Sequence, residues 1–455
     1  MSYIDIMSYI LIVYIKNIIC YNQPMICENI TTKDNELYFN GFKVSELAKK
    51  YGSPLYLMDE NRIRHNVNVY KTALKKYFGD DALMLYASKA CSFKYIYSIM
   101  QDENVGIDVV SSGEIYTAKG AGFDLSKAYF HSNNKTDEDI CFAISNNIGY
   151  FVADNIEEIE IINKEAKRQN KTQKILLRVT PGIDTHTYEA DKTGKVDSKF
   201  GTAIETGQAI EIVEKILAFE HVELCGFHCH VGSQVFEEDV FERTAIIMIK
   251  FFNEVKEKFN LDTKIFDIGG GIGVRYVEND PTIDIDKKLQ DLSIVIDNEL
   301  KKYNLSKPAF RMEPGRSIVA DAGMTIYTVG TIKKIPGYKN YVSVDGGMTD
   351  NPRFALYGAI HSCLTANKMN EKTDYQADLV GRCCESGDII IPKAMFPQSI
   401  SRYDIVAVTT TGAYNYSMAS NYNRIPRPAV VMLKDDKDFV VVKRETFDNL
   451  IENDI

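Results

Sequence analysis

The feature of this sequence that most constrains its fold is an alternation between short apolar runs and longer amphipathic segments. Eight runs, rich in β-branched and aromatic residues, occupy residues 83–88, 106–111, 127–132, 150–154, 174–180, 223–231, 264–269 and 309–314. Continuous apolar runs are typical of strands buried on both faces of a parallel sheet. The segments between them, such as 155–170, 204–219 and 239–259, show helical spacing. Eight successive β/α units predict a (β/α)8 TIM-like barrel, while a doubly wound open sheet would produce similar runs.

The pattern changes after residue 316, where strand-like segments follow one another with few helical stretches between them. These segments are residues 325–332, 341–347, 378–384, 404–412, 429–433 and 439–444. The sequence therefore predicts an α/β chain of two domains, a barrel over 59–316 and a mostly β domain over 317–455. Residues 25–58 are expected to join the β domain.

Residues 4–20 are strongly apolar but are interrupted by Asp5 and Lys16. The apolar stretch is short for a membrane span, and it lacks the basic start and cleavage site of a signal peptide. We interpret residues 1–24 as an extension outside the core, with Met25 as a candidate start. A membrane anchor is the less favoured alternative.

Composition excludes several classes of protein. Hydrophobic residues make up 45% of the 455 residues and charged residues 25%, which excludes global disorder. The net charge is −10 and no basic tract stands out, so no nucleic-acid partner is expected. Nine scattered cysteines without a C-x-x-C pair suggest neither a disulfide framework nor a zinc knuckle. Reduced thiols and a cytoplasmic location are expected.

Polar residues and glycines stand at the end of nearly every apolar run. In barrel enzymes the active site lies at the carboxyl ends of the strands, so these residues are expected to converge. They are Ser88-Lys89, Asp108 with Ser111 to Glu114, Arg178, His228 to Ser233, Gly269 to Gly273, and Glu313 to Arg316.

Each of these signals is weak alone. A lysine after an apolar run is usually solvated or paired, and GGGIG lacks the GK[ST] of a nucleotide-binding loop. His228 and His230 share a strand face without an acidic partner in their motif, so packing or ring stacking is favoured over a metal site. Together, however, the residues meet the needs of pyridoxal 5′-phosphate (PLP). A lysine can bind its aldehyde, a glycine-rich turn its phosphate, a carboxylate its ring nitrogen, and an imidazole its ring face.

Several motifs resemble those of the fold-type III PLP-dependent decarboxylases. These are Tyr86 to Ala90, His230 to Gln234, Asp267 to Gly273, and Glu313 to Arg316. The second half of the chain narrows the resemblance to the diaminopimelate decarboxylase family. Its motifs are Asp345 to Met348, Asn351 to Arg353 with Leu356-Tyr357, Cys384 to Asp388, and Gly412 to Tyr414. The resemblance extends from about residue 36 to the end of the chain.

The resemblance implies a role for each matched residue around the cofactor. Lys89 would bind the cofactor aldehyde covalently, and His230 would stack on the ring. Glu313 would contact the pyridine nitrogen. The remaining cofactor contacts would come from Ser233, Gly271, Pro314, Gly315, Arg316 and Tyr414.

The resemblance also implies the reaction, which is decarboxylation of meso-2,6-diaminopimelate to L-lysine and CO2. The substrate would be held by Arg316, Arg353, Tyr357, Glu385 and Tyr414. Cys384 would be the catalytic acid, although Cys383 precedes it where the family usually has another residue. Cys384 and Glu385 would reach the site of a second subunit, which implies a homodimer with shared active sites.

Three alternatives stay open at the level of sequence. A decarboxylase for carboxynorspermidine or ornithine would share most motifs, but its substrate lacks the distal carboxylate that the arginines suit. A non-catalytic PLP-binding protein would lack the β domain. A barrel hydrolase would use His228 and His230 as metal ligands, whereas we expect no metal.

Overall fold

The computed structural model describes residues 27–183 and 197–455, and these residues form two compact units. One unit comprises residues 62–274 and 281–320, and we refer to it as the barrel unit. The other, the β unit, comprises residues 27–61, 275–280 and 321–455. The expectation for residues 1–24 falls outside the described residues.

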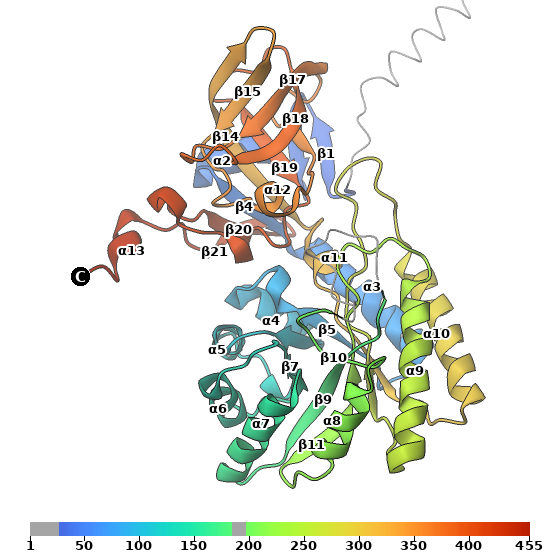
Figure 1. Cartoon of the computed structure of the whole chain (residues 1–455). Coiled ribbons are helices and arrows are strands. Elements are labelled where there is room, and N and C mark those ends of the chain that lie inside the picture. The colour runs from blue at the N-terminus through green and yellow to red at the C-terminus, as the bar shows by residue number, and fades with distance from the viewer. Residues whose placement is uncertain (1–26, 184–196) are drawn as a thin grey trace, which may run out of the picture. The chain divides into compact units, whose positions relative to one another are not determined.

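The barrel unit contains a closed cylinder of eight parallel strands (Figure 1). The strands are β5 (Leu83–Ala87), β6 (Gly106–Val109), β7 (Ala128–Phe130), β8 (Tyr150–Ala153), β9 (Gln173–Thr180), β11 (Val222–His228), β12 (Ile265–Asp267) and β13 (Ala309–Met312). Pairing of β8 with β9 and of β13 with β5 closes the cylinder. Each of the eight apolar runs therefore coincides with one barrel strand to within a residue at its start, and the predicted fold class is confirmed.

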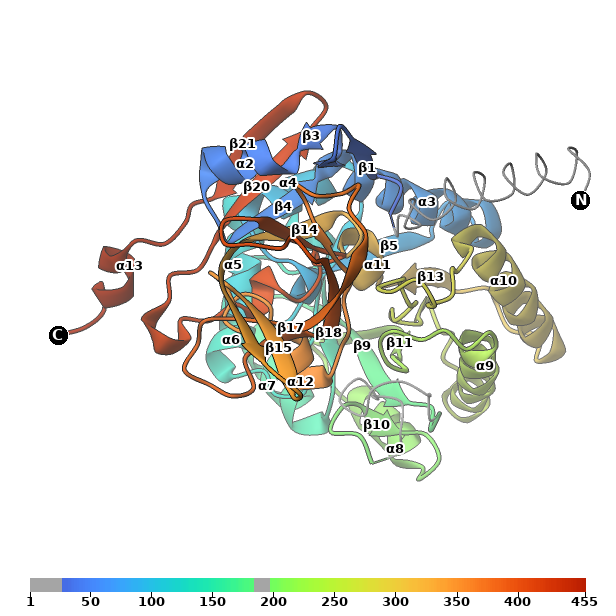
Figure 2. The same ribbon diagram turned by 90° about the horizontal axis from the view of Figure 1, so that it is seen from above.

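Helices follow the strands in the order that the alternation predicts. They are α3 (Glu60–Phe78), α4 (Lys94–Asp102), α5 (Ser112–Gly120), α6 (Asp137–Ser145), α7 (Ile156–Arg168), α8 (Gln208–Ile216), α9 (Val240–Phe259), α10 (Ile285–Lys302) and the short α11 (Arg316–Val319). Two 3₁₀ turns, η1 (Ser88–Ala90) and η2 (Leu125–Lys127), and the two-residue strand β10 (Thr202–Ala203) complete the unit. The long helices α9 and α10 lie side by side (Figure 2).

The interior of the barrel is packed with side chains from most of its strands. One buried cluster draws a single residue from each of six strands: Leu85, Tyr129, Val152, Leu176, Cys225 and Ile265. The rings of Tyr129 and Tyr150 stack at 4.4 Å between centroids. Because the interior is filled in this way, function is left to the strand ends.

The β unit is built on a sheet with strand order β18-β17-β15-β14-β4-β20-β21. Its strands are β4 (Leu55–Asp59), β14 (Gly323–Ile335), β15 (Lys339–Val344), β16 (Cys363–Thr365), β17 (Thr373–Val380), β18 (Ile389–Pro397), β19 (Ile405–Thr409), β20 (Ala429–Lys434) and β21 (Lys437–Val442). A small sheet precedes it, made of β1 (Ile30–Lys33), β2 (Glu36–Phe39) and β3 (Phe42–Lys43). The helical elements are α2 (Val44–Tyr51), α12 (Arg353–Tyr357), η4 (Tyr416–Met418), η5 (Tyr422–Arg424) and α13 (Phe447–Ile451).

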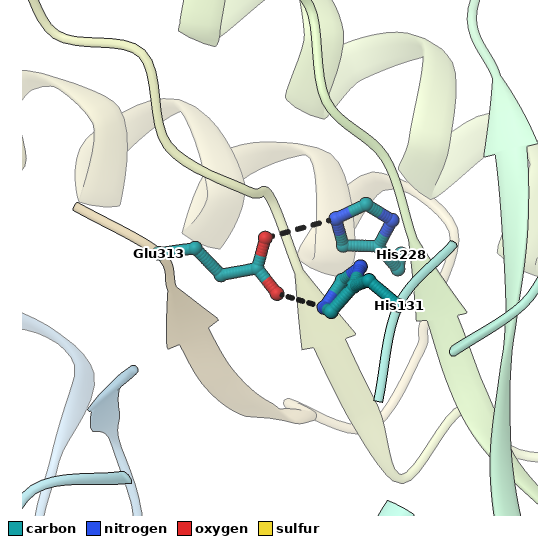
Figure 3. A group of neighbouring side chains, drawn as sticks. All are labelled: His131, His228 and Glu313. Atoms are coloured by element: carbon teal, nitrogen blue, oxygen red, sulfur yellow. Dashed lines mark hydrogen bonds and ion pairs between the residues drawn. The ribbon is translucent and has the colours of Figure 1, made fainter. Parts of the chain in front are cut away.

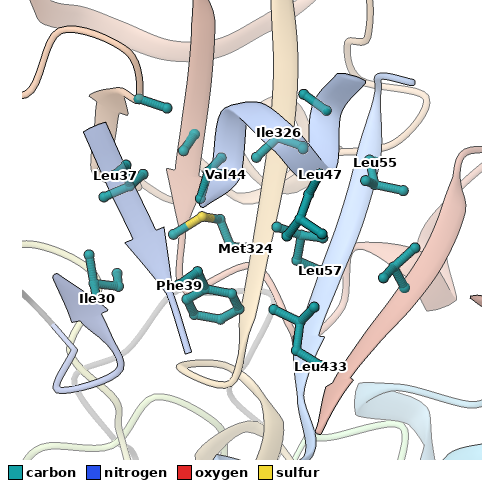
Figure 4. Close-up of a cluster of buried hydrophobic side chains, with 14 of the residues drawn as sticks. Ile30, Leu37, Phe39, Val44, Leu47, Leu55, Leu57, Met324, Ile326 and Leu433 are labelled. Atoms are coloured by element: carbon teal, nitrogen blue, oxygen red, sulfur yellow. The ribbon is translucent and has the colours of Figure 1, made fainter. Parts of the chain in front are cut away.

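Strand β4 lies in the middle of this sheet although it precedes the barrel in sequence. It pairs antiparallel with β14 and parallel with β20. Leu55 and Leu57 are cross-strand neighbours of Ile326 and Met324, and all four are buried in one cluster with Leu433 (Figure 4). The N-terminal segment thus contributes a central strand and part of the core of the β unit.

Two details of the β unit differ from the sequence reading. Strands β16 and β18 lie outside the predicted segments. The predicted segment 378–384 is a strand only as far as Val380, because the chain then turns tightly against Asp388. A Cβ on Gly381 would lie 2.3 Å from a carboxylate oxygen of Asp388, so glycine is required there.

Among residues 27–183 and 197–455, no helix combines the length and apolar character needed to cross a membrane.

Candidate active site

The predicted residues of the barrel unit gather at the carboxyl ends of its strands. Lys89 lies in η1 directly after β5, and Glu313 directly follows β13. His230 and Ser233 follow β11, and Gly271 follows β12. This is the end of a (β/α)8 barrel at which catalytic groups are found.

Lys89 extends toward Asp108 on the neighbouring strand β6. Its Nζ is 3.9 Å from Oδ2 of Asp108, and 45% of the lysine side chain is exposed. Asp108 itself is buried. Burial raises the pKa of Asp108, and the charges of His131 and Lys89 oppose that rise. The lysine amine is therefore accessible on one side and faces a buried carboxyl group on the other.

Glu313 is a buried carboxylate that two histidines contact (Figure 3). Its Oε1 is 2.7 Å from Nε2 of His131, and its Oε2 is 3.1 Å from Nε2 of His228. Burial favours the protonated acid, but the two histidines outweigh it and hold the pKa of Glu313 well below its usual value. Burial lowers the pKa of His228 to about 3, so this ring is neutral. The structure thus provides an ionised carboxylate in a site largely shielded from water.

His230 lies against the glycine-rich turn that follows β12. The backbone N–H of Gly270 donates to Nδ1 of His230 at 3.3 Å, so the neutral ring carries its proton on Nε2. Burial holds the pKa of His230 well below its usual value. Gly271 has φ +123°, and a Cβ there would lie 2.1 Å from the carbonyl oxygen of Gly232. Only glycine lets the turn approach this closely.

Ser233 and Arg316 meet across the mouth of the barrel. Nε and one terminal nitrogen of Arg316 both donate to the hydroxyl of Ser233, at 3.1 and 2.9 Å. Arg316 is the first residue of α11 and is buried. Its neighbour Gly315 packs against Ala87, where a Cβ would come within 2.8 Å of the alanine methyl. The carbonyl of Pro314 accepts a hydrogen bond from Ala87 N–H at 3.2 Å, which ties the Glu313–Arg316 turn to β5.

In the β unit, three predicted residues form a second group. Arg353 opens α12 and is buried. Its guanidinium lies 4.2 Å from the ring centroid of Tyr357 and 5.4 Å from that of Tyr414. The two nearby aromatic rings restrict the orientation of the guanidinium, which suits bidentate binding of a carboxylate.

Cys384 and Glu385 lie apart from that group, on the exposed loop between β17 and β18. The N–H of Cys384 donates to Oδ1 of Asn423 at 2.8 Å. The loop follows Val380 and ends at the buried Asp388, whose carboxylate accepts backbone hydrogen bonds from Cys383 and Met348. Both cysteines are free thiols.

Three buried polar residues of the barrel unit have no role predicted from the sequence: His131, Asp108 and Arg178. Arg178 is buried, with its guanidinium 4.5 Å from the ring centroid of Phe200. His131 directly follows β7, so the strand-end rule that selected the other residues would also have selected it. Its contact with Glu313 joins two residues far apart in the chain and has no local sequence signal.

Comparisons with known proteins agree with this geometry. Residues 60–320 match the family model described as "Pyridoxal-dependent decarboxylase, pyridoxal binding domain". The diaminopimelate decarboxylase of Staphylococcus aureus (strain COL) is 43% identical over 425 residues, which cover 93% of this chain and 98% of that protein. That of Bacillus subtilis (strain 168) is 40% identical, with 93% and 97% covered.

The fold agrees as well. The crystal structure of diaminopimelate decarboxylase from M. jannaschii in complex with L-lysine matches with a TM-score of 0.86 and 33% identity, covering 95% of this chain and 98% of that one. The resemblance seen in the sequence motifs is therefore confirmed over nearly the whole chain, and the protein belongs to the diaminopimelate decarboxylase family of PLP-dependent enzymes.

Proposed function

We propose that this protein is a PLP-dependent enzyme that converts meso-2,6-diaminopimelate to L-lysine and CO2, the last step of lysine biosynthesis. The observation that carries the proposal is the ionised, buried Glu313 at the same barrel end as the accessible amine of Lys89. Near-complete coverage of diaminopimelate decarboxylases by the chain supports the choice of reaction.

The residues of the barrel end fit the cofactor group by group. The groups that PLP requires are present: an amine, an anionic carboxylate, a neutral imidazole, an arginine–serine pair and a close-packed glycine turn. When bound, PLP supplies a conjugated ring that accepts the electron pair left on Cα as CO2 departs. Lys89 would hold its aldehyde carbon and His230 would lie on its ring face.

Glu313 would accept a hydrogen bond from the protonated pyridine nitrogen. An anion at this position keeps that nitrogen protonated, and a cationic ring is a stronger electron acceptor than a neutral one. Ser233, Gly271, Pro314, Gly315, Arg316 and Tyr414 would make the remaining contacts with the cofactor.

The substrate carries a carboxylate and an ammonium group at its distal end. Arg316 and Arg353 suit the carboxylate through paired N–H donors, and Glu385 suits the ammonium. Tyr357 and Tyr414 would complete the substrate contacts. An ornithine-type substrate has no distal carboxylate, so it would leave an arginine without its anionic partner.

Cys384 would donate the proton that replaces CO2 on Cα. We propose that the enzyme is a homodimer in which Cys384 and Glu385 serve the barrel of the other subunit. The exposure of both residues on the β17–β18 loop supports this arrangement. A cytoplasmic location stays a prediction.

The test of the reaction combines two measurements on the purified holoenzyme. We expect an absorption band of protein-bound PLP, together with L-lysine formation from meso-diaminopimelate and no turnover of ornithine. Lys89→Ala should lose both signals, whereas Lys119→Ala, an exposed lysine on α5, should keep them. Failure to form lysine, or preferential turnover of ornithine, would overturn the proposed substrate.

The shared site is tested by mixing two inactive variants, Lys89→Ala and Cys384→Ala. If each site draws Lys89 and Cys384 from different subunits, mixed dimers contain one intact site and one doubly defective site. Activity should then return to roughly a quarter of the wild-type value after subunit exchange. No recovery in a mixture that is shown to exchange subunits would contradict the arrangement.

A further inference from the structure

The cluster of His131, His228 and Glu313 contains two side chains that the proposed chemistry does not use. Each histidine comes from a strand other than that of Glu313: His131 follows β7 and His228 ends β11. All three residues are at least nine-tenths buried. The two rings are 4.8 Å apart with an interplanar angle of 74°, so they approach the carboxylate from different directions (Figure 3).

Each histidine contacts a different oxygen of the Glu313 carboxylate. His131 Nε2 is 2.7 Å from Oε1, and His228 Nε2 is 3.1 Å from Oε2. A carboxylate can accept about four hydrogen bonds, two on each oxygen. The contact with His228 is a hydrogen bond, whereas that with His131 is a close ion-pair contact, and one contact on each oxygen restricts the plane of the carboxylate.

The backbone fixes the same geometry. The N–H of Glu313 donates to the carbonyl of Gly269 at 2.8 Å, and the N–H of His131 donates to the carbonyl of Val109 at 2.7 Å. His228 pairs in register with Asp267 on β12. The three side chains therefore start from backbone positions set by the barrel ladder.

We propose that His131 and His228 are positioning residues that hold Glu313 as an oriented anion for the pyridine nitrogen of PLP. The inference rests on the proposed role of Glu313 as the partner of that nitrogen. The histidines do not touch the reacting atoms; they act on the ring through Glu313. Without them, burial would drive Glu313 toward its neutral acid, which could not favour a protonated ring nitrogen.

A zinc site would use the same three residues, but the distances favour direct contacts between the histidines and the carboxylate. Nitrogen and oxygen ligands lie about 2.0–2.2 Å from zinc, which places tetrahedral ligand atoms roughly 3.3 Å from one another. The 2.7 Å contact between His131 and Glu313 is shorter than that spacing. Direct contact between the would-be ligands leaves no room for an ion between them.

The experiment measures the protonation of the cofactor itself. Holoenzyme is prepared with PLP labelled with ¹⁵N in the ring, and the ring ¹⁵N chemical shift is recorded by NMR. We expect a protonated ring nitrogen in the wild type. Replacement of either histidine by leucine should move the signal toward that of the neutral ring and lower kcat by about 10- to 100-fold with a smaller change in KM, as expected when a charge-assisted hydrogen bond is lost.

Glutamine provides the matched control because its side-chain amide can place an N–H near the position of Nε2. In His131→Gln and His228→Gln the ring ¹⁵N chemical shift should stay close to that of the wild type. If the histidines only filled space, the leucine and glutamine variants would behave alike. Should the leucine variants fail to fold, ¹⁵N-histidine labelling of the wild-type holoenzyme tests whether His228 can donate a hydrogen bond to Glu313. The ring of His228, assigned by its loss in His228→Gln, should be neutral with its proton on Nε2.

The outcomes separate this inference from the proposed role of Glu313. If Glu313→Gln shifts the ring signal and the leucine variants do not, the positioning role is wrong and the role of Glu313 stands. If Glu313→Gln also leaves the signal unchanged, the proposed role of Glu313 itself fails. Stoichiometric binding of Zn²⁺ to the holoenzyme that His228→Gln abolishes would replace the positioning role by a metal site.

Discussion

The carboxylate of Asp388 accepts a hydrogen bond from the backbone N–H of Cys383 at 2.7 Å. Both residues belong to the loop between β17 and β18. The other carboxylate oxygen of Asp388 accepts a hydrogen bond from the N–H of Met348 at 2.6 Å. Because Asp388 is buried, the loop is tied to the turn after β15 by bonds that water cannot easily replace. Both bonds are donated by backbone N–H groups, which a cysteine-to-alanine substitution keeps, so the two adjacent cysteines can be tested separately.

We expect Cys384→Ala to lower kcat by about 10²- to 10⁴-fold, the usual contribution of a positioned proton donor. Cofactor absorbance should stay unchanged. Cys383→Ala is the matched control, because it keeps the N–H that Asp388 binds, and it should retain most activity. Steady-state lysine formation measures both variants. A near-normal rate for Cys384→Ala together with a large loss for Cys383→Ala would reverse the assignment of the acid.

Arg353→Ala should raise KM for meso-diaminopimelate by about 10- to 100-fold, which corresponds to the loss of a charged hydrogen bond. Cofactor content should not change. Arg353→Lys keeps the charge but not the planar fork that lies near Tyr357 and Tyr414, so an intermediate KM is expected. Equal KM values for the wild type and Arg353→Ala would remove Arg353 from the substrate site.

Lys135 and Glu158 form an ion pair inside the barrel unit. Nζ of Lys135 is 2.8 Å from Oε1 of Glu158 and also donates to the carbonyls of Val152 and Ser132. Both side chains are almost completely buried, so Lys135→Met should destabilise the protein by about 3–5 kcal/mol by leaving a buried carboxylate unpaired.

Thermal and denaturant unfolding of the holoenzyme measure this loss. Adding Glu158→Gln to Lys135→Met should recover part of the stability, because it removes the unpaired charge. Lys164→Met, at an exposed lysine on α7, should have little effect. A Lys135→Met variant as stable as wild type would show that the pair contributes nothing to folding.

The buried His228 predicts a pH dependence of stability. Burial lowers its pKa to about 3, below the usual 6.5, so the folded protein binds this proton less readily than the unfolded chain. The associated stability is complete above about pH 6.5 and is lost as the pH falls toward 3, at up to about 1.4 kcal/mol per pH unit.

Between pH 6.5 and pH 5 the free energy of unfolding of the wild type should thus fall by about 2 kcal/mol more than that of His228→Gln. Glu313 has a lowered pKa and loses its contribution only below about pH 4.5, outside this window. Melting curves at saturating PLP provide the comparison. Parallel stability profiles for the wild type and the variant would mean that His228 titrates normally.

The barrel could be predicted from the sequence because strands buried on both faces leave an unbroken apolar run. The β unit was predicted less completely. Strand β18 contains Pro392 and ends at Pro397, and proline argues against a central strand. The strand lies at the edge of the sheet, where proline is tolerated, and an edge position cannot be identified without the topology.

For the candidate site, the sequence predicts which barrel end carries the chemistry but not which side chains touch. Ser233 and Arg316 are 83 residues apart in the chain, and their hydrogen bonds depend on barrel closure. His131 is similar: its role toward Glu313 depends on strand order around the cylinder. Motif resemblance provided the other assignments, and it could not provide one for a histidine outside the matched motifs.

The central place of β4 in the β unit has a consequence for synthesis on the ribosome. Residues 55–59 emerge early, yet their two neighbours in the sheet lie at 323–335 and 429–434. This segment therefore lacks both of its neighbouring strands while the intervening barrel is translated. A chain released before residue 429 would carry an open strand edge beside hydrophobic side chains, a favourable template for aggregation and a natural target for chaperones.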